Sequence, residues 1–179
     1  MIKVIAFDFI GVLATEKDDV LQDYEDKIER LFGKNTSNED FIKEASIYTN
    51  KDIVKVTKDI INKLYLVINN DVISKLKKEY PNTLIIVASN HVSYVKDFIN
   101  EHFNVDDVII SADIHKTKPN SDFYEYILNK YNIKSNELLF LDDRIDNINA
   151  ASKLGINTIH VMKDIDLYNK IKEYLWLVF

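Results

Sequence analysis

Five runs of apolar residues along the chain have the length and the β-branched content of buried parallel strands. Segments with the 3.6-residue periodicity of amphipathic helices follow the last four runs. Such an alternation of strand and helix predicts an α/β fold, a three-layer Rossmann-like parallel sheet with helices on both faces. The predicted strands are Lys3–Phe9, Thr83–Ser89, Asp107–Ser111, Leu138–Asp142 and Asn157–Met162, and the predicted helices are Ser93–Phe103, Ser121–Tyr131, Asp146–Leu154 and Ile165–Tyr174.

The segment between the first two strands has a different pattern. From Thr15 to about Tyr80 no run is typical of a strand, and apolar residues recur at helical spacing, as in Val20, Tyr24 and Ile28. We therefore expect residues 15–79 to form a small all-helical cap inserted after the first strand, and residues 1–14 and 80–179 to form the core. Such an insert is placed to cover the loop after the first strand, or it only adds stability.

Composition narrows the function classes. Of the 179 residues, 46% are hydrophobic and 29% are charged, which is typical of an ordinary globular protein. A net charge of −6 argues against a general nucleic-acid binder, and the absence of cysteine excludes thiol catalysis and disulfides. No apolar segment approaches the roughly 20 residues of a membrane helix, and the apolar run in the first residues is shorter than that of a signal peptide, so we expect neither. We expect a cytoplasmic protein that binds neither nucleic acid nor membrane.

Polar residues of chemical interest fall at the carboxyl ends of the predicted strands, the edge at which open α/β sheets bind ligands. Taken singly, each has an ordinary structural interpretation, such as a turn residue, a helix cap or a solvated lysine. Asp8 and the adjacent aspartates Asp142 and Asp143 should converge if the first and fourth strands are neighbours. Carboxylates that lie so close together repel one another unless a cation is present. A site made only of oxygen ligands suits Mg²⁺. The residues are Asp8, Ser89-Asn90, Lys118-Pro119 and Asp142-Asp143.

In order and spacing, four stretches resemble the four motifs of the haloacid dehalogenase-like hydrolase superfamily. The resemblance covers essentially the whole predicted core. It implies a Mg²⁺-dependent phosphatase that acts on a small phosphorylated metabolite through an aspartyl-phosphate on Asp8. The stretches are Phe7-Asp8-Phe9-Ile10-Gly11-Val12-Leu13, Ile85-Ile86-Val87-Ala88-Ser89-Asn90, Lys118-Pro119-Asn120 and Leu139–Ala151.

The resemblance also implies roles for individual residues. Asp8, Ser89 and Lys118 would be catalytic, and Ser89, Asn90, His91 and Lys118 would bind the substrate. His91 follows the second motif directly and is either a substrate contact, a replacement acid/base or an exposed loop residue. The Mg²⁺ ligands would be Asp8, the backbone carbonyl of Ile10 and Asp143, and Asp142 would either bind the ion directly or support the residues that do.

The chain departs from the family pattern at one position. The phosphatases carry a second aspartate two residues after the nucleophile, as general acid/base, and here that residue is Ile10. Losing such a group typically costs about 10²–10⁴-fold in rate. Three alternatives stay open: a catalytically weak or inactive protein with a binding role, a phosphonatase-like enzyme and a dehalogenase-like enzyme. The dehalogenases of the family use no metal, and the Asp142-Asp143 pair argues against that alternative.

Overall fold

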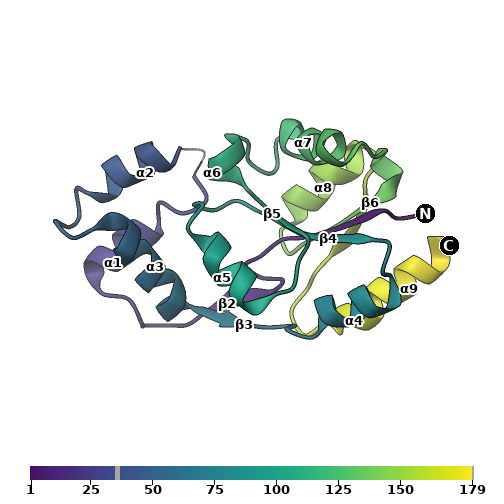
Figure 1. Ribbon diagram of the computed structural model, residues 1–179, viewed down its shortest axis with the longest axis horizontal. Helices are drawn as coiled ribbons and strands as arrows, with labels where there is room; N and C mark the ends of the chain where they lie inside the picture. Colours follow the sequence, from purple (N-terminus) through teal and green to yellow (C-terminus); the bar gives the residue numbers. More distant parts are fainter. Residues whose placement is uncertain (35–36, 179) are drawn as a thin grey trace.

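A five-stranded parallel sheet lies at the centre of the computed structural model, which describes residues 1–34 and 37–178 (Figure 1). The strand order is β5-β4-β1-β6-β7, so β4 and β5 lie on one side of β1, and β6 and β7 lie on the other. All five predicted strands are confirmed, and β1 pairs with β6 as expected of the first and fourth strands. The bounds are β1 Val4–Phe7, β4 Leu84–Ser89, β5 Asp107–Ile110, β6 Leu138–Asp142 and β7 Asn157–His160.

Helices cover both faces of the sheet and give the predicted three layers. Alternate residues of β1 point to opposite faces: Ile5 and Phe7 join the larger hydrophobic cluster, and Val4 and Ala6 join a second one. The helices α4, α5 and α9 contribute to the larger cluster, and α7 and α8 contribute to the second. Their bounds are α4 Val72–Glu79, α5 Val95–His102, α7 Ser121–Tyr131, α8 Ile145–Lys153 and α9 Leu167–Val178, with short turns at α6 Ser111–Ile114 and η1 Ser135–Glu137.

The segment inserted after β1 contains three helices but is not entirely helical. Figure 1 shows α1 (Asp23–Glu29), α2 (Asn38–Ala45) and α3 (Ile53–Leu64) together at one end of the molecule. Two short strands, β2 (Ala14–Glu16) and β3 (Tyr65–Val67), pair in antiparallel fashion at the base of these helices. The prediction of an all-helical insert is wrong here, because three-residue strands are too short to show an alternating pattern.

Helix α4 packs with the core, although the expected boundary at residue 79 assigned it to the cap. Its buried residues Val72, Ile73 and Leu76 belong to the larger cluster of the sheet, and it packs against α9. The packing therefore favours a boundary before α4, with α1, α2 and α3 as the inserted helices. None of the helices in the described ranges is long and apolar enough to cross a membrane.

The inserted helices share their hydrophobic cluster with the loop between β4 and α5. This cluster combines residues such as Ile28, Phe41 and Ile60 with Val92, which belongs to that loop. Two polar contacts lie beside it: Asn38 Nδ2 donates to Ser93 Oγ (2.7 Å), and Lys58 forms an ion pair with Asp97 (2.6 Å). Separating the inserted helices from the core would expose Val92, so the structure holds them against the loop that starts at Ser89.

Candidate active site

Asp8 follows β1 directly and is almost fully buried, at 7% exposure. Its own N–H donates to the carbonyl of Leu141 on β6 (2.8 Å), which continues the sheet contact by one residue. The N–H of Phe9 donates to Asp8 Oδ1 (2.7 Å). These backbone contacts fix the carboxylate at the carboxyl edge of the sheet.

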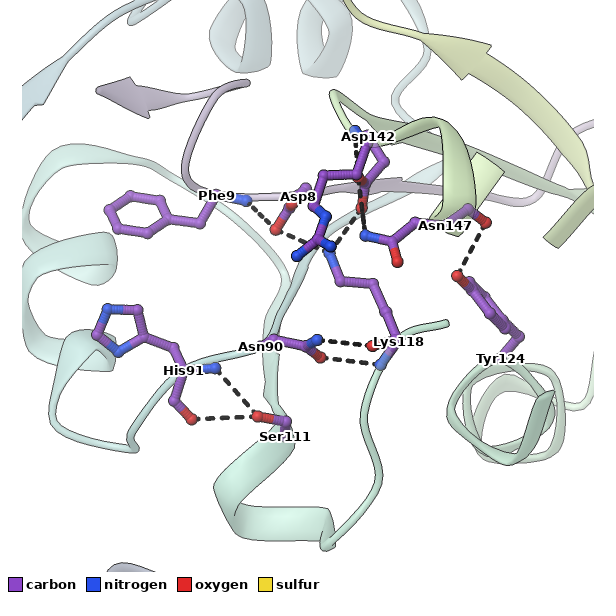
Figure 2. A network of polar contacts seen from close by, with 10 residues as sticks. Asp8, Phe9, Asn90, His91, Ser111, Lys118, Tyr124, Asp142 and Asn147 are labelled. Carbon is purple, nitrogen blue, oxygen red and sulfur yellow. Dashed lines mark hydrogen bonds and ion pairs between the residues drawn. The ribbon is translucent and has the colours of Figure 1, made fainter. Parts of the chain in front are cut away.

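Lys118 brings two of the carboxylates together. Its Nζ lies 2.8 Å from Asp8 Oδ1 and 2.7 Å from Asp142 Oδ2, and its side chain is 1% exposed. Figure 2 shows the lysine side chain reaching both carboxylates. A buried ammonium between two buried carboxylates is stable only with good geometry, because all three groups have lost their hydration.

The backbone of Lys118 is held in turn by the side chain of Asn90. Asn90 Nδ2 donates to the Lys118 carbonyl (2.8 Å), and the Lys118 N–H donates to Asn90 Oδ1 (2.9 Å). Both ends of the amide are thereby occupied, as Figure 2 shows. The Asn90 side chain positions the lysine, which leaves its backbone N–H as the group for the predicted substrate contact.

Asp142 receives further hydrogen bonds that sequence reasoning missed. Asn147 Nδ2 lies 2.9 Å from Asp142 Oδ1 and 3.0 Å from Oδ2, and the Arg144 N–H donates to Oδ1 (2.8 Å). The Tyr124 hydroxyl donates to the Asn147 carbonyl (2.9 Å). The only signal in the sequence is the place of Asn147 in the first turn of the helix that follows the acidic pair. Its role is to satisfy a fully buried carboxylate.

Three carboxylates gather at this edge and can hold a cation. Asp8, Asp142 and Asp143 each offer an oxygen, and these atoms lie within 4.8 Å of one another. Burial raises the pKa of Asp8 to about 6, with Asp142 adding to the rise and Lys118 opposing it. Burial and the charge of Asp142 likewise raise the pKa of Asp143. Carboxylates this close repel one another, and a hard divalent cation bound by their oxygens would relieve that repulsion.

Gly11 allows Asp143 to approach this cluster. Its φ of +83° lies in the left-handed region, and an added Cβ would lie 2.4 Å from Asp143 Oδ2. Any other residue would be strained and would displace the carboxylate. Ile10, just before it, is half-buried, and its side chain packs against the larger hydrophobic cluster. The metal contact expected of the Ile10 carbonyl stays a prediction.

Ser89 ends β4 at the same edge of the sheet. The register pairs Val87 with Phe7, so Ser89 lies level with the start of the loop that carries Asp8. The residue is buried, at 3% exposure. Its placement agrees with the predicted contact to a substrate, which stays a prediction.

His91 lies away from this cluster, contrary to the expectation of a substrate contact or an exposed loop residue. It is 2% exposed, and Figure 2 shows its ring pointing away from Asp8 and Lys118. The Val92 N–H donates to Nδ1 (2.9 Å), so a neutral ring carries its proton on Nε2, which lies 2.6 Å from the Tyr65 hydroxyl. Both nitrogens are occupied, and the packing of Phe9, Phe32 and Tyr65 rings around the imidazole explains why it is buried.

A groove reaches the cluster from the side of Asp143. Its volume is about 690 Å³, and Gly11 and Asp143 are among its lining residues. Asp8, Lys118 and Asp142 are buried, whereas Asp143 is exposed. The groove therefore offers a ligand a route to the acidic cluster. The other lining residues are Thr15, Ile68, Asn69, His160, Val161, Met162, Lys163, Asp164 and Ile165.

Comparisons with known proteins agree with this arrangement. Residues 5–161 match the family model of the haloacid dehalogenase-like hydrolases. A segment of 59 residues is 36% identical to a glyceraldehyde 3-phosphate phosphatase from Methanocaldococcus jannaschii, but it covers only 32% of this chain and 26% of that protein.

Solved structures show the same fold over nearly the whole chain. A predicted HAD-like family hydrolase from Porphyromonas gingivalis has a TM-score of 0.77 at 23% identity, with 98% of both chains covered. A HAD family enzyme from Bacteroides thetaiotaomicron, solved in complex with magnesium and inorganic phosphate, has a TM-score of 0.73 at 16% identity, covering 95% of this chain and 99% of that one.

The burial of His91 predicts a pH-dependent stability. Burial lowers the pKa of His91 from 6.5 to about 4, so the unfolded chain binds the proton more readily between these pH values. The stabilising contribution is present in full above about pH 6.5 and is lost as the pH falls toward 4, by up to about 3 kcal/mol. Urea unfolding of wild type and His91→Gln across this range should show a smaller loss in the variant.

The exposed His102 supplies the matched control for this experiment. His102→Gln should keep the wild-type dependence of the unfolding free energy on pH. Equal profiles for wild type and His91→Gln would show that His91 is not held in its neutral form by the fold.

Proposed function

Because the chain belongs to the haloacid dehalogenase-like hydrolase family, we propose that it is a Mg²⁺-dependent phosphatase that acts on a small phosphorylated metabolite through an aspartyl-phosphate on Asp8. One observation supports this most directly: a buried Lys118 that contacts Asp8 and Asp142 beside a cluster of three carboxylates. The pairing orients one carboxylate as a nucleophile and balances the charge around it.

Asp8 has one oxygen oriented by the protein and one available for chemistry. Phe9 and Lys118 both donate to Oδ1. Among the described residues, none donates a hydrogen bond to Oδ2, so this oxygen is the one we assign to attack on phosphorus. Lys118 keeps the carboxylate ionised at neutral pH by opposing the effect of burial on its pKa.

The remaining groups would bind the phosphoryl oxygens. Ser89 and the N–H of Asn90 end β4 beside Asp8, where they can donate to a transferred phosphoryl group, and Lys118 offsets the charge that develops on it. Asp8, Asp142, Asp143 and the Ile10 carbonyl would hold Mg²⁺, which neutralises the carboxylates and polarises the phosphoryl group. The magnesium and phosphate bound by the Bacteroides thetaiotaomicron enzyme support this assignment.

A non-catalytic or nearly inactive protein that binds a phosphometabolite is the second candidate. Two observations favour it: Ile10 carries no proton to transfer, and Asp8, Ser89 and Lys118 are buried beneath the surface. A measurement of phosphate turnover distinguishes the phosphatase from the binding protein. A binding protein needs the carboxylates for its ligand but does not need a nucleophile.

The direct test is phosphate release from acetyl phosphate with and without Mg²⁺. Wild type should release phosphate only with Mg²⁺, and Asp8→Asn should lower the rate by at least about 10³-fold, because the nucleophile is lost. Asp146→Asn is the matched control, since Asp146 is an exposed carboxylate four residues from Asp142. It should keep the wild-type rate.

Activity that survives in Asp8→Asn would contradict the covalent mechanism. A folded wild type that releases no phosphate from acetyl phosphate, while it still binds Mg²⁺ and inorganic phosphate, would support the binding role instead.

Gly11 offers a test of the cation site that does not depend on turnover. Gly11→Ala puts an alanine at a backbone φ of +83°, which strains it, and places a methyl group 2.4 Å from Asp143 Oδ2. Displacing a ligand in this way should weaken Mg²⁺ binding by roughly 10–100-fold, as measured by isothermal titration calorimetry.

The control for this variant is Gly155→Ala. Gly155 has a similar φ of +77°, but an added Cβ would meet nothing closer than 3.8 Å, at Ser135. It should lose some stability and keep the wild-type Mg²⁺ affinity. Equal affinities for all three proteins would contradict the assignment of Asp143 as a ligand.

A further inference from the structure

In the phosphatases of this family the residue two positions after the nucleophile supplies the proton for the leaving group, and here that residue is Ile10. Ile10 lies in the short loop between β1 and β2, and its backbone forms a bridge with Ala14, the first residue of β2. The side chain packs against the larger hydrophobic cluster. The residue two positions after the nucleophile is therefore apolar and has no proton to transfer.

His91 and Lys118, the two proton-carrying side chains expected to contact a substrate, are already engaged by other groups. His91 and Tyr65 contact each other at 2.6 Å, and Val92 occupies the second ring nitrogen of His91. Lys118 already donates to Asp8 and Asp142. Among the described residues, Lys118 is the only side chain that forms an ion pair with Asp8, and its proton is needed to hold the nucleophile.

A phosphoryl transfer without an acid depends on the leaving group alone. Asp8 Oδ2 forms a bond to phosphorus, the bond from phosphorus to the leaving oxygen breaks, and the electron pair departs with that oxygen. An alkoxide from a sugar or alcohol is too basic to leave readily in this form. The carboxylate of an acyl phosphate needs no proton, since carboxylic acids have a pKa of about 4.

We propose, on the basis of the proposed function, that the substrates are phosphoryl compounds whose leaving group departs as a stable anion, acyl phosphates above all. The aspartyl-phosphate formed on Asp8 is itself an acyl phosphate. Its hydrolysis balances without an enzyme base: water attacks phosphorus, Asp8 leaves as a carboxylate, and both protons of the water remain on the released phosphate. Apolar Ile10 thus restricts the substrate class rather than abolishing the chemistry.

The test is a series of aryl phosphates whose phenols differ in acidity, from unsubstituted phenol with a pKa of about 10 down to nitrophenols. The ratio kcat/KM covers the steps up to phenol release, so slow hydrolysis of the aspartyl-phosphate does not affect it. Wild type should react much faster as the phenol becomes more acidic. Ile10→Asp should speed the reaction of phenyl phosphate by about 10²–10⁴-fold and that of the nitrophenyl esters far less.

Ile10→Asn is the matched control, because it has the size and polarity of Ile10→Asp but no acidic proton. It should keep the steep wild-type dependence on phenol acidity. If Ile10→Asp does not fold, as judged by circular dichroism, the slopes of wild type and Ile10→Asn still decide the question.

Two other outcomes overturn the inference in distinguishable ways. A wild-type kcat/KM that hardly changes along the series, with Asp8→Asn inactive, would show that another group protonates the leaving oxygen and would leave the proposed function intact. No Asp8-dependent reaction with any of these esters or with acetyl phosphate would overturn the proposed function and this inference together.

Discussion

The contact on which the site depends is the buried ammonium of Lys118 between Asp8 and Asp142. These groups come from three separate parts of the chain: the end of β1, the loop before α7 and the end of β6. Removing one partner from such a buried arrangement costs about 3–5 kcal/mol, because a charge is left without compensation. Without Lys118 the two carboxylates would repel each other at the edge where adjacent strands β1 and β6 end.

The surrounding hydrogen bonds hold Lys118 in place and supply donors to the Asp142 carboxylate. Asn90 fixes the backbone of Lys118, and Asn147 donates to both oxygens of Asp142. The same loop that carries Asn90 continues into His91 and Val92, which pack against the inserted helices and β3. The position of the inserted helices is thereby coupled to the residues that hold the nucleophile.

Most of the fold followed from hydrophobic periodicity, and most of the cluster followed from motif order. The five strands are buried and rich in β-branched residues, and the neighbouring parallel strands β1 and β6 end at one edge, so Asp8 and the Asp142-Asp143 pair converge. The errors have physical reasons. The β2–β3 pair is too short for a periodic signal. The roles of His91 and Asn147 depend on tertiary neighbours, Tyr65 and Asp142, that no local pattern encodes.

The proposed mechanism depends on Asp8, which Lys118 orients and which would accept a phosphoryl group without help from a neighbouring acid. The most direct measurement is acid quenching of the wild-type protein after brief mixing with Mg²⁺ and acetyl phosphate, followed by peptide mass spectrometry. The peptide that contains Asp8 should gain the mass of one phosphoryl group, which hydroxylamine should release and which should be absent from Asp8→Asn. An unmodified Asp8 peptide from a protein that consumes acetyl phosphate, or a phosphoryl group on another residue, would contradict this mechanism.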